Sequence, residues 1–270
     1  MDAIYTDVSN EALVTAIRTN LCEFFRHTSR SNPREHLEND RFTRWHTPFP
    51  HPWLNGVLSS ELPGKGVRSF IDESIRYFHE KAVNTFTWWT APHLSPSDWG
   101  SILSKHNFAF STETAGMAVD LHEMNGFMPQ VDGLEIRPVE DEHSLRMWAK
   151  VFTRGYGLPP EWECVAFDLW RKLGLDLPMR NYIGTLNGEP VSTSSLFIGG
   201  GVAGVYCVST LPGARGKGLG TALTVKPLRD AREMGYRIGV LHSSGTRNSI
   251  HKKLGGRHLC QIENYYLTIL

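Results

Sequence analysis

Three glycines at alternate positions, Gly216, Gly218 and Gly220, have the spacing of a backbone anion-binding site. An apolar, β-branched and aromatic run before them predicts a strand over 202–209, and apolar periodicity after them predicts a helix over 218–234. Glycine has no Cβ to keep a ligand away from the main chain, so the unpaired N–H groups at the start of the helix can converge on an anion. This pattern predicts a phosphate-binding turn.

Two positive charges, Arg215 and Lys217, lie within the same turn, which suits a pyrophosphate. Two common phosphate motifs do not fit the spacing. A P-loop reads G-x-x-x-x-G-K-[ST], and here the order of glycine and lysine is wrong. The segment 213–218 is a poor match to the dinucleotide-binding motif G-x-G-x-x-G. We call residues 212–220 the glycine loop.

The run from Arg215 to Gly220 resembles the [RQ]-x-x-G-x-[GA] signature of the GCN5-related N-acetyltransferases (GNATs), which bind acetyl-coenzyme A. Val208 and Pro212 occupy the places of the V-x-x-x-P that precedes this signature in the family. The resemblance therefore implies acetyl-CoA as cofactor. The residues that it implies for coenzyme binding are Cys207, Val208, Ser209, Arg215, Gly216, Lys217, Gly218, Leu219, Gly220, Thr221, Asn248 and His251.

In this family the strand before the loop lends backbone groups to the pantetheine arm, and the resemblance places the oxyanion near the N–H of Val208. The family's tyrosine, which lies near the coenzyme sulfur, is replaced here. The chain has His251 at that place, three residues after Asn248, and Gly256 where the family has phenylalanine. Imidazole can donate a proton near neutral pH, so His251 is the candidate proton donor; a plain coenzyme contact or a decayed position are the alternatives.

A general base is harder to identify from the sequence. Glu163 is the first candidate, in the region that shapes acceptor specificity in the family, and the alternatives are Glu161, His242, Tyr265 and Tyr266. The residues expected to contact the acceptor are Trp88, Glu161, Tyr206 and Tyr265. Neighbours on a strand point to opposite faces, so at least one of Trp88 and Trp89 is expected in the core.

The chain divides into two similar halves by the order of its predicted elements. We expect a degenerate GNAT-like accessory domain over 1–125, a linker over 126–133 and a catalytic GNAT domain over 134–270. No R-x-x-G-x-G occurs before residue 130. The expected fold class is therefore α/β, with the mixed α+β sheet of the GNAT acyl-CoA N-acyltransferase fold in two tandem copies.

Periodicity and turn residues predict the individual elements. Helices are predicted over 11–27, 67–83, 97–106, 141–152, 158–173, 218–234 and 248–254. Strands are predicted over 41–47, 53–58, 85–90, 108–121, 134–139, 181–186, 190–198, 202–209, 236–241 and 262–269. The polar segment 29–40 is expected to be a loop, and Asn187-Gly188 to be a tight hairpin turn.

Composition excludes several classes of protein. The 270 residues are 40% hydrophobic and 21% charged, with no apolar run long enough to span a bilayer and no signal-peptide pattern, so we expect a cytoplasmic protein without membrane contact. Four scattered cysteines predict neither a disulfide framework nor a zinc site, and His46 and His51 lack a third ligand, so no metal is expected.

Net charge is zero overall but uneven along the chain. Residues 1–130 hold 11 Lys and Arg against 15 Asp and Glu, whereas residues 131–270 hold 17 against 13. The positive half contains the glycine loop, which suits a cofactor with several phosphates. Nucleic acid is not expected as a partner, because the balance is neutral and aromatic residues do not alternate with basic ones.

The function predicted from these features is an N-acetyltransferase that moves an acetyl group from acetyl-CoA to a small-molecule amine, such as an amino acid, an amine metabolite or a toxin. Two alternatives stay open at this stage. One is a catalytically silent coenzyme-binding or ligand-sensing module, suggested by His251 and Gly256, and the other is a protein N-acetyltransferase. Assembly into a homo-oligomer is also left open.

Overall fold

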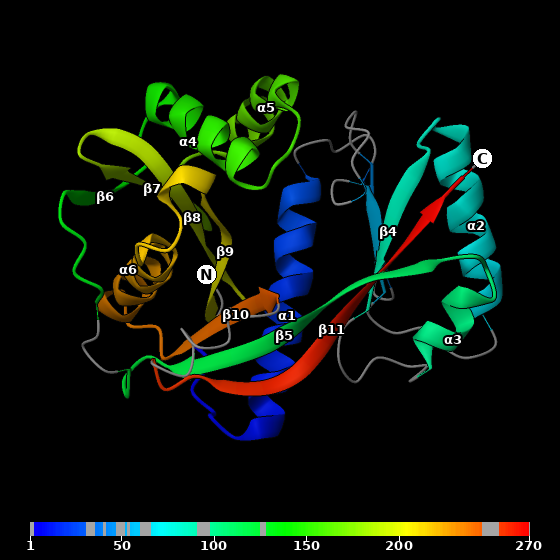
Figure 1. The fold of residues 1–270 in the computed structure, drawn as a ribbon. Coiled ribbons are helices and arrows are strands. Elements are labelled where there is room, and N and C mark those ends of the chain that lie inside the picture. Colours follow the sequence, from blue (N-terminus) through cyan, green and yellow to red (C-terminus); the bar gives the residue numbers. More distant parts are fainter. Residues whose placement is uncertain are drawn as a thin grey trace. The chain divides into compact units, whose positions relative to one another are not determined.

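The computed structural model describes residues 3–30, 36–39, 42–46, 52, 55–59, 66–90, 98–124, 128–244 and 254–269. The helices are α1 (Asn10–Ser29), α2 (Val67–Glu80), α3 (Trp99–Ser104), α4 (Glu142–Gly155), α5 (Glu163–Leu173) and α6 (Leu219–Glu233), with short 3-10 turns η3 (Pro160–Trp162) and η4 (Pro212–Ala214). The strands are β1 (His36–Asn39), β2 (Phe42–Trp45), β3 (Gly56–Ser59), β4 (Thr85–Trp89), β5 (Ala109–Asp120), β6 (Leu134–Pro138), β7 (Met179–Leu186), β8 (Glu189–Gly199), β9 (Val202–Thr210), β10 (Ile238–Ser244) and β11 (Arg257–Thr268). Figure 1 labels the helices α1 to α6 and the strands β4 to β11.

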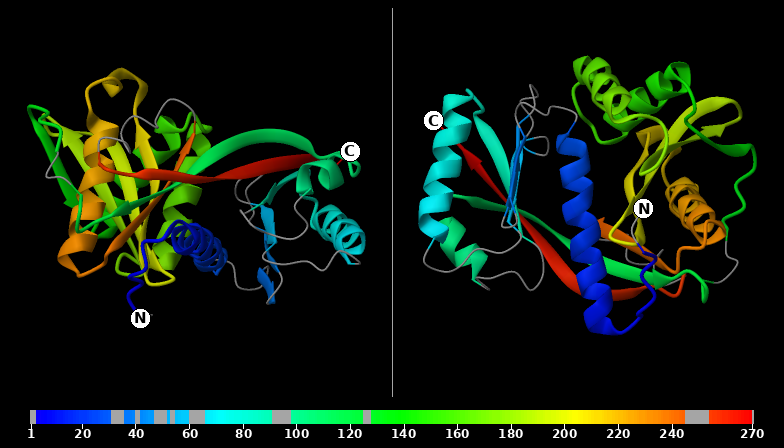
Figure 2. Two further views of the ribbon diagram at one scale, coloured as in Figure 1. Left: turned by 90° about the horizontal axis from the view of Figure 1, so that it is seen from below. Right: turned by 180° about the vertical axis from the view of Figure 1, so that it is seen from behind.

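The chain forms two compact units whose boundaries differ from the predicted division at 125 and 134. The first unit contains residues 1–20 and 117–259, and the second contains residues 21–116 and 260–270. The difference arises because strands that are distant in sequence pair with each other. The last strand, β11, pairs antiparallel with β4 from the first half of the chain. Figure 2 shows β11 and β5, the two long strands that contribute residues to both units, side by side.

The first unit holds the glycine loop. Its strands follow the order β5-β10-β9-β8-β7-β6, in which β9 and β10 are parallel and β6 to β9 are antiparallel neighbours. Helices α4 and α6 pack against β8 and β9. The completely buried side chains of this unit include Leu145, Trp148, Tyr182, Leu196, Leu223 and Val240.

Local signals in this unit act as the sequence predicts. Asn187 and Gly188 both have positive φ (52° and 86°) and connect β7 to β8, which confirms the predicted tight turn because only such angles match the twist of a two-residue hairpin. Helix α4 begins with a capping box, in which the Asp141 carboxylate accepts from the amide of Ser144 at 2.7 Å.

The second unit has the strand order β1-β2-β3-β4-β11-β5 and contains α2 and α3. Residues 36–39 form strand β1, within the segment predicted to be a loop; this strand pairs with β2, a contact that its own sequence does not indicate. Residues 248–253 of the predicted helix 248–254 lie outside the described residues. None of the helices in the described ranges is both long and apolar enough to cross a membrane.

Candidate coenzyme and acyl-transfer site

The glycine loop joins β9 to α6 through one 3-10 turn, η4. Gly216 and Gly218 have φ of +79° and +85°, a region that side chains with a Cβ rarely adopt. Gly218 is the N-cap of α6, and no side chain caps this end of the helix. A Cβ at Gly216 would meet no heavy atom within 4 Å, so the main chain there faces open space.

Six consecutive backbone amides, from Gly216 to Thr221, make no hydrogen bond to any other described residue, whereas the amide of Arg215 donates to the carbonyl of Pro212 and that of Ala222 to the carbonyl of Gly218. The first amides of a helix have no partner within the helix, and here the preceding loop adds three more. The N-terminal end of the helix dipole also favours negative charge. The arrangement can therefore accept an anion with several oxygens.

Arg215 donates hydrogen bonds to two carbonyl groups of the protein. Its Nε donates to the carbonyl of Thr210 at 3.1 Å and its Nη2 to the carbonyl of Gly155 at 2.8 Å. The guanidinium thus connects the end of β9 to the C-terminal end of α4, where orphan carbonyls favour a cation. The predicted contact of Arg215 with the coenzyme stays a prediction, and Lys217, which is exposed, is the loop cation without such contacts among the described residues.

Strand β9 contains a bulge just before the loop. The pairing with β8 shifts between Thr193↔Ser209 and Ser195↔Tyr206, so Cys207 and Val208 together face one residue of β8. Cys207 has φ of +53°, and the side chain of Thr193 donates to its carbonyl at 2.9 Å. Burial raises the pKa of the Cys207 thiol to about 12, so the thiol is protonated at neutral pH.

Strands β9 and β10 separate at the same point. Their parallel pairing ends at Leu241↔Val205, although β9 continues to Thr210 and β10 to Ser244. Among the described residues, the segment 206–210 therefore has no paired strand on the side of β10, where backbone groups are available to a ligand. The bulge, the separation and the glycine loop are consecutive in the chain, so a long ligand could contact all three.

Helix α4 packs closely against the bulged segment. The phenol of Tyr156 donates to the carbonyl of Val208 at 3.3 Å. Gly155 allows this approach, because a Cβ there would lie 1.8 Å from the hydroxyl of Ser209. Sequence reasoning did not single out Gly155 or Tyr156. Both lie beyond the helix predicted over 141–152, and only their contacts with β9 give them a role.

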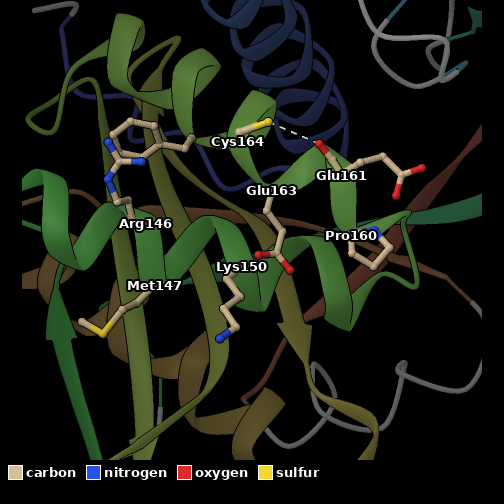
Figure 3. Close-up of a pocket in the computed structure, with 8 residues that line it drawn as sticks. Arg146, Met147, Lys150, Pro160, Glu161, Glu163 and Cys164 are labelled. Carbon is tan, nitrogen blue, oxygen red and sulfur yellow. Dashed lines mark hydrogen bonds between the residues drawn. The ribbon is translucent and has the colours of Figure 1, made fainter.

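Glu161 and Glu163 line one shallow pocket of about 450 Å³ formed by α4, η3 and α5 (Figure 3). The other lining residues are Arg146, Met147, Lys150, Pro160, Cys164 and Phe167. The carboxylate of Glu163, the predicted base, accepts from Nε of Arg154 at 2.6 Å. Its nearest described charge partner is thus a guanidinium, and no residue of β9 lines the pocket.

The other residues predicted to contact the acceptor fall in two places. Tyr206 lies at the separation of β9 and β10, with its ring 5.4 Å from that of His242. Trp88 and Tyr265 belong to the core of the second unit, where Trp88 is completely buried and Tyr265 is 7% exposed. Both side chains are members of a core cluster, and their predicted contacts with the acceptor stay predictions.

The remaining predicted coenzyme residues lie partly in α6 and partly outside the described residues. Leu219, Gly220 and Thr221 form the first turn of α6. Asn248 and His251 lie outside the described residues, so their predicted roles stay predictions. The sequence analysis did not name Asn20, which is completely buried on the apolar face of α1. The available sequence signal was a polar residue three positions after Ile17, within the apolar stripe of a predicted helix.

Comparison with solved structures identifies the fold. A GCN5-related N-acetyltransferase from Kribbella flavida is similar over 93% of this chain and 95% of its own, with 15% identity and a TM-score of 0.67. A tandem GNAT protein from the clavulanic acid biosynthesis pathway matches over 98% and 97%, with 12% identity and a TM-score of 0.60. The glucosamine N-acetyltransferase region of a fungal multi-domain β-N-acetylglucosaminidase matches over 97% of this chain and 38% of its own, with 11% identity and a TM-score of 0.61. The chain therefore has a mixed α/β GNAT-like fold over nearly its whole length, as expected.

The sequence was also compared with protein-family models. Residues 143–254, which include most of α4, the bulge and the glycine loop, match the model of the Acetyltransferase (GNAT) family. This match confirms the expected resemblance over that part of the chain. No curated protein matches the sequence.

Proposed function

We propose that this protein is an acetyl-CoA-dependent N-acetyltransferase whose acceptor is a small-molecule amine. The observation that carries the proposal is the set of free amides from Gly216 to Thr221, next to the segment where β9 separates from β10. The match of residues 143–254 to the GNAT family model supports the reaction class. The names of two structural neighbours, a tandem GNAT protein from the clavulanic acid biosynthesis pathway and a glucosamine N-acetyltransferase region, support a small acceptor by analogy of fold alone.

The residues present fit a coenzyme A moiety. The free amides and the helix N-terminus would hold the pyrophosphate, Lys217 would add charge, and the unpaired side of 206–210 would hold the pantetheine arm. When bound, acetyl-CoA supplies the acetyl group as a thioester. The bulge at Cys207 and Val208 turns backbone groups out of the ladder, so the N–H of Val208 can stabilise negative charge on the reacting carbonyl oxygen.

The first experiment tests the coenzyme site with Gly218→Asp. This change adds a Cβ and a negative charge among the free amides, so we expect coenzyme A affinity, measured by calorimetry, to fall about 100-fold or more, which corresponds to roughly 2.7 kcal/mol. Gly188→Asp is the matched control: it has nearly the same φ (+86°), no heavy atom within 4 Å of its Cβ, and lies in the hairpin turn. Equal affinities for the two folded variants would reject the site.

The second experiment separates the enzyme from a silent coenzyme-binding module. Wild-type protein with acetyl-CoA and a panel of amino sugars, amino acids and polyamines should release free thiol faster than without amine. Coenzyme binding without any amine-dependent release would favour the silent module. Label transfer from acetyl-CoA to proteins of a cell extract, with no small acceptor, would favour a protein acetyltransferase.

A further inference from the structure

Three polar side chains form a buried chain inside the first unit: Asn20 on α1, Tyr206 on β9 and His242 on β10. The phenol of Tyr206 lies 2.7 Å from Oδ1 of Asn20 and 3.4 Å from Nε2 of His242. Asn20 is completely buried and Tyr206 is 9% exposed. Burying a polar group costs free energy unless it makes a hydrogen bond. The geometry of these three side chains therefore indicates which atom donates and which accepts in each hydrogen bond.

The hydrogen bonds fix which atom donates. Nδ2 of Asn20 donates to the carbonyl of Gly199 at 2.9 Å, so Oδ1 is the atom that faces Tyr206 and must accept. The phenol then gives its single proton to Asn20, and its oxygen can only accept from His242. Nε2 of His242 therefore carries a hydrogen, and in a neutral imidazole the other nitrogen, Nδ1, carries a lone pair.

Nδ1 of His242 is buried and has no hydrogen-bond partner among the described residues. The residue as a whole is half-buried, whereas Nδ1 itself is shielded from solvent. Both rings lie one residue beyond the last β9-β10 pair, Leu241↔Val205, where the two strands begin to separate. The unsatisfied lone pair is thus located where the proposed reaction takes place.

Burial lowers the pKa of His242 to about 4, because the charged imidazolium loses solvation. The direction agrees with the hydrogen-bond argument: at neutral pH the ring is neutral and Nδ1 is available as an acceptor. A neutral imidazole can take a proton from an amine nitrogen once that nitrogen becomes acidic, which happens as it bonds to the acyl carbon.

We propose that Nδ1 of His242 accepts the proton that the acceptor amine loses during acetyl transfer, and that Tyr206 and Asn20 are positioning residues that fix the His242 tautomer. This proposal rests on the proposed function. In the balanced step, the C–N bond forms and the thioester C–S bond breaks. The nitrogen gives one proton to Nδ1, the departing sulfur takes one proton from solvent and leaves as thiol, and His242 returns its proton to solvent.

The first test is independent of activity. Long-range proton-nitrogen NMR of the His242 ring in the full-length protein at pH 7 should show a protonated Nε2 and a bare Nδ1, assigned by loss of the signals in His242→Gln. Tyr206→Phe should mix the two tautomers, because the acceptor of the Nε2 hydrogen is lost. A protonated Nδ1 in the wild type would overturn the proposal.

The second test is kinetic and uses the amine of the panel that gives the fastest thiol release. His242→Gln retains a donor that can reach Tyr206 but has no nitrogen lone pair at the Nδ1 position. We expect kcat/KM for the amine to fall about 100-fold or more while coenzyme A affinity changes less than 3-fold. Tyr206→Phe should lower kcat/KM less, about 10-fold. His143→Gln, the same change on the exposed first turn of α4, is the control.

The two proposals can fail separately. An active wild type with an equally active, folded His242→Gln would overturn the proton-acceptor role and leave the acetyltransferase intact. A wild type that transfers acetyl to no amine would overturn both. A His242→Gln variant that loses coenzyme affinity together with activity would indicate a structural role, and would also overturn the proposal.

Discussion

At the scale of single residues, charge type did not determine function in the glycine loop. Arg215 and Lys217 lie two residues apart and carry the same charge, yet the guanidinium of Arg215 is used by the carbonyls of Thr210 and Gly155. The planar fork of arginine suits two carbonyls at once, which an ammonium group cannot match. One residue therefore holds the loop in place, and its neighbour is the one available to a ligand.

This difference predicts opposite results for two alanine variants. Arg215→Ala should lower the free energy of unfolding by about 1 kcal/mol, because two carbonyls lose charged donors in a partly exposed site. Lys217→Ala should leave stability unchanged within 0.5 kcal/mol by the usual range of surface changes, and weaken coenzyme A binding several-fold at low salt, less at high salt. Urea denaturation and calorimetry at two ionic strengths measure both. An unchanged stability for Arg215→Ala, or a salt-independent affinity loss for Lys217→Ala, would contradict these roles.

At the scale of elements, the site depends on how closely α4 approaches β9. The helix ends at Gly155, where the missing Cβ leaves room for Ser209, and the next residue, Tyr156, bonds to the carbonyl of Val208. The bulge at Cys207 is thus supported by a helix from one side while the other side is open toward β10. A larger residue at 155 should disturb both the packing and the bulge.

We expect Gly155→Ala to cost about 1–3 kcal/mol of stability, because a methyl group would lie 1.8 Å from the Ser209 hydroxyl and overpacking in a buried contact costs this much. Ser209→Ala alone should cost less than about 1 kcal/mol. The double variant should recover part of the loss, since the closest atom is gone. Thermal and urea denaturation of the three variants test this; strictly additive losses would show that Ser209 is not the obstacle.

At the scale of the whole molecule, the compact units are not continuous in the chain. The first unit needs residues 1–20 and 117–120 as well as the predicted catalytic segment, and its contacts include Asn20 with the carbonyl of Gly199 and an ion pair of Asp120 with Arg237 at 3.1 Å. The last strand of the predicted catalytic domain belongs instead with β4.

The predicted domain 134–270, expressed alone, should therefore fail to fold, because β10 loses its neighbour β5 and β11 loses its partner β4. An unpaired strand edge promotes aggregation. Size-exclusion chromatography and thermal denaturation, with the full-length chain as control, measure the outcome. A monomeric fragment with a cooperative transition and the coenzyme A affinity of the full chain would contradict the observed division.

Much of the site could be predicted from sequence because its determinants are local. Positive φ at Gly216 and Gly218, the turn at Asn187-Gly188 and the start of α6 follow from backbone preferences within a few residues. Those preferences do not depend on distant parts of the chain. The sequence by itself therefore determined the glycine loop, the resemblance of residues 143–254 to the GNAT family and most helices and strands.

Tertiary structure alone decided which side chains the site uses. Asn20 and Tyr206 are 186 residues apart, and only strand and helix packing brings them together. The same packing buried Trp88, assigned Arg215 to two carbonyls and moved β11 to the second unit. The physical reason is that burial and hydrogen-bond partners are properties of contacts distant in sequence, whereas local patterns specify only the elements that make those contacts.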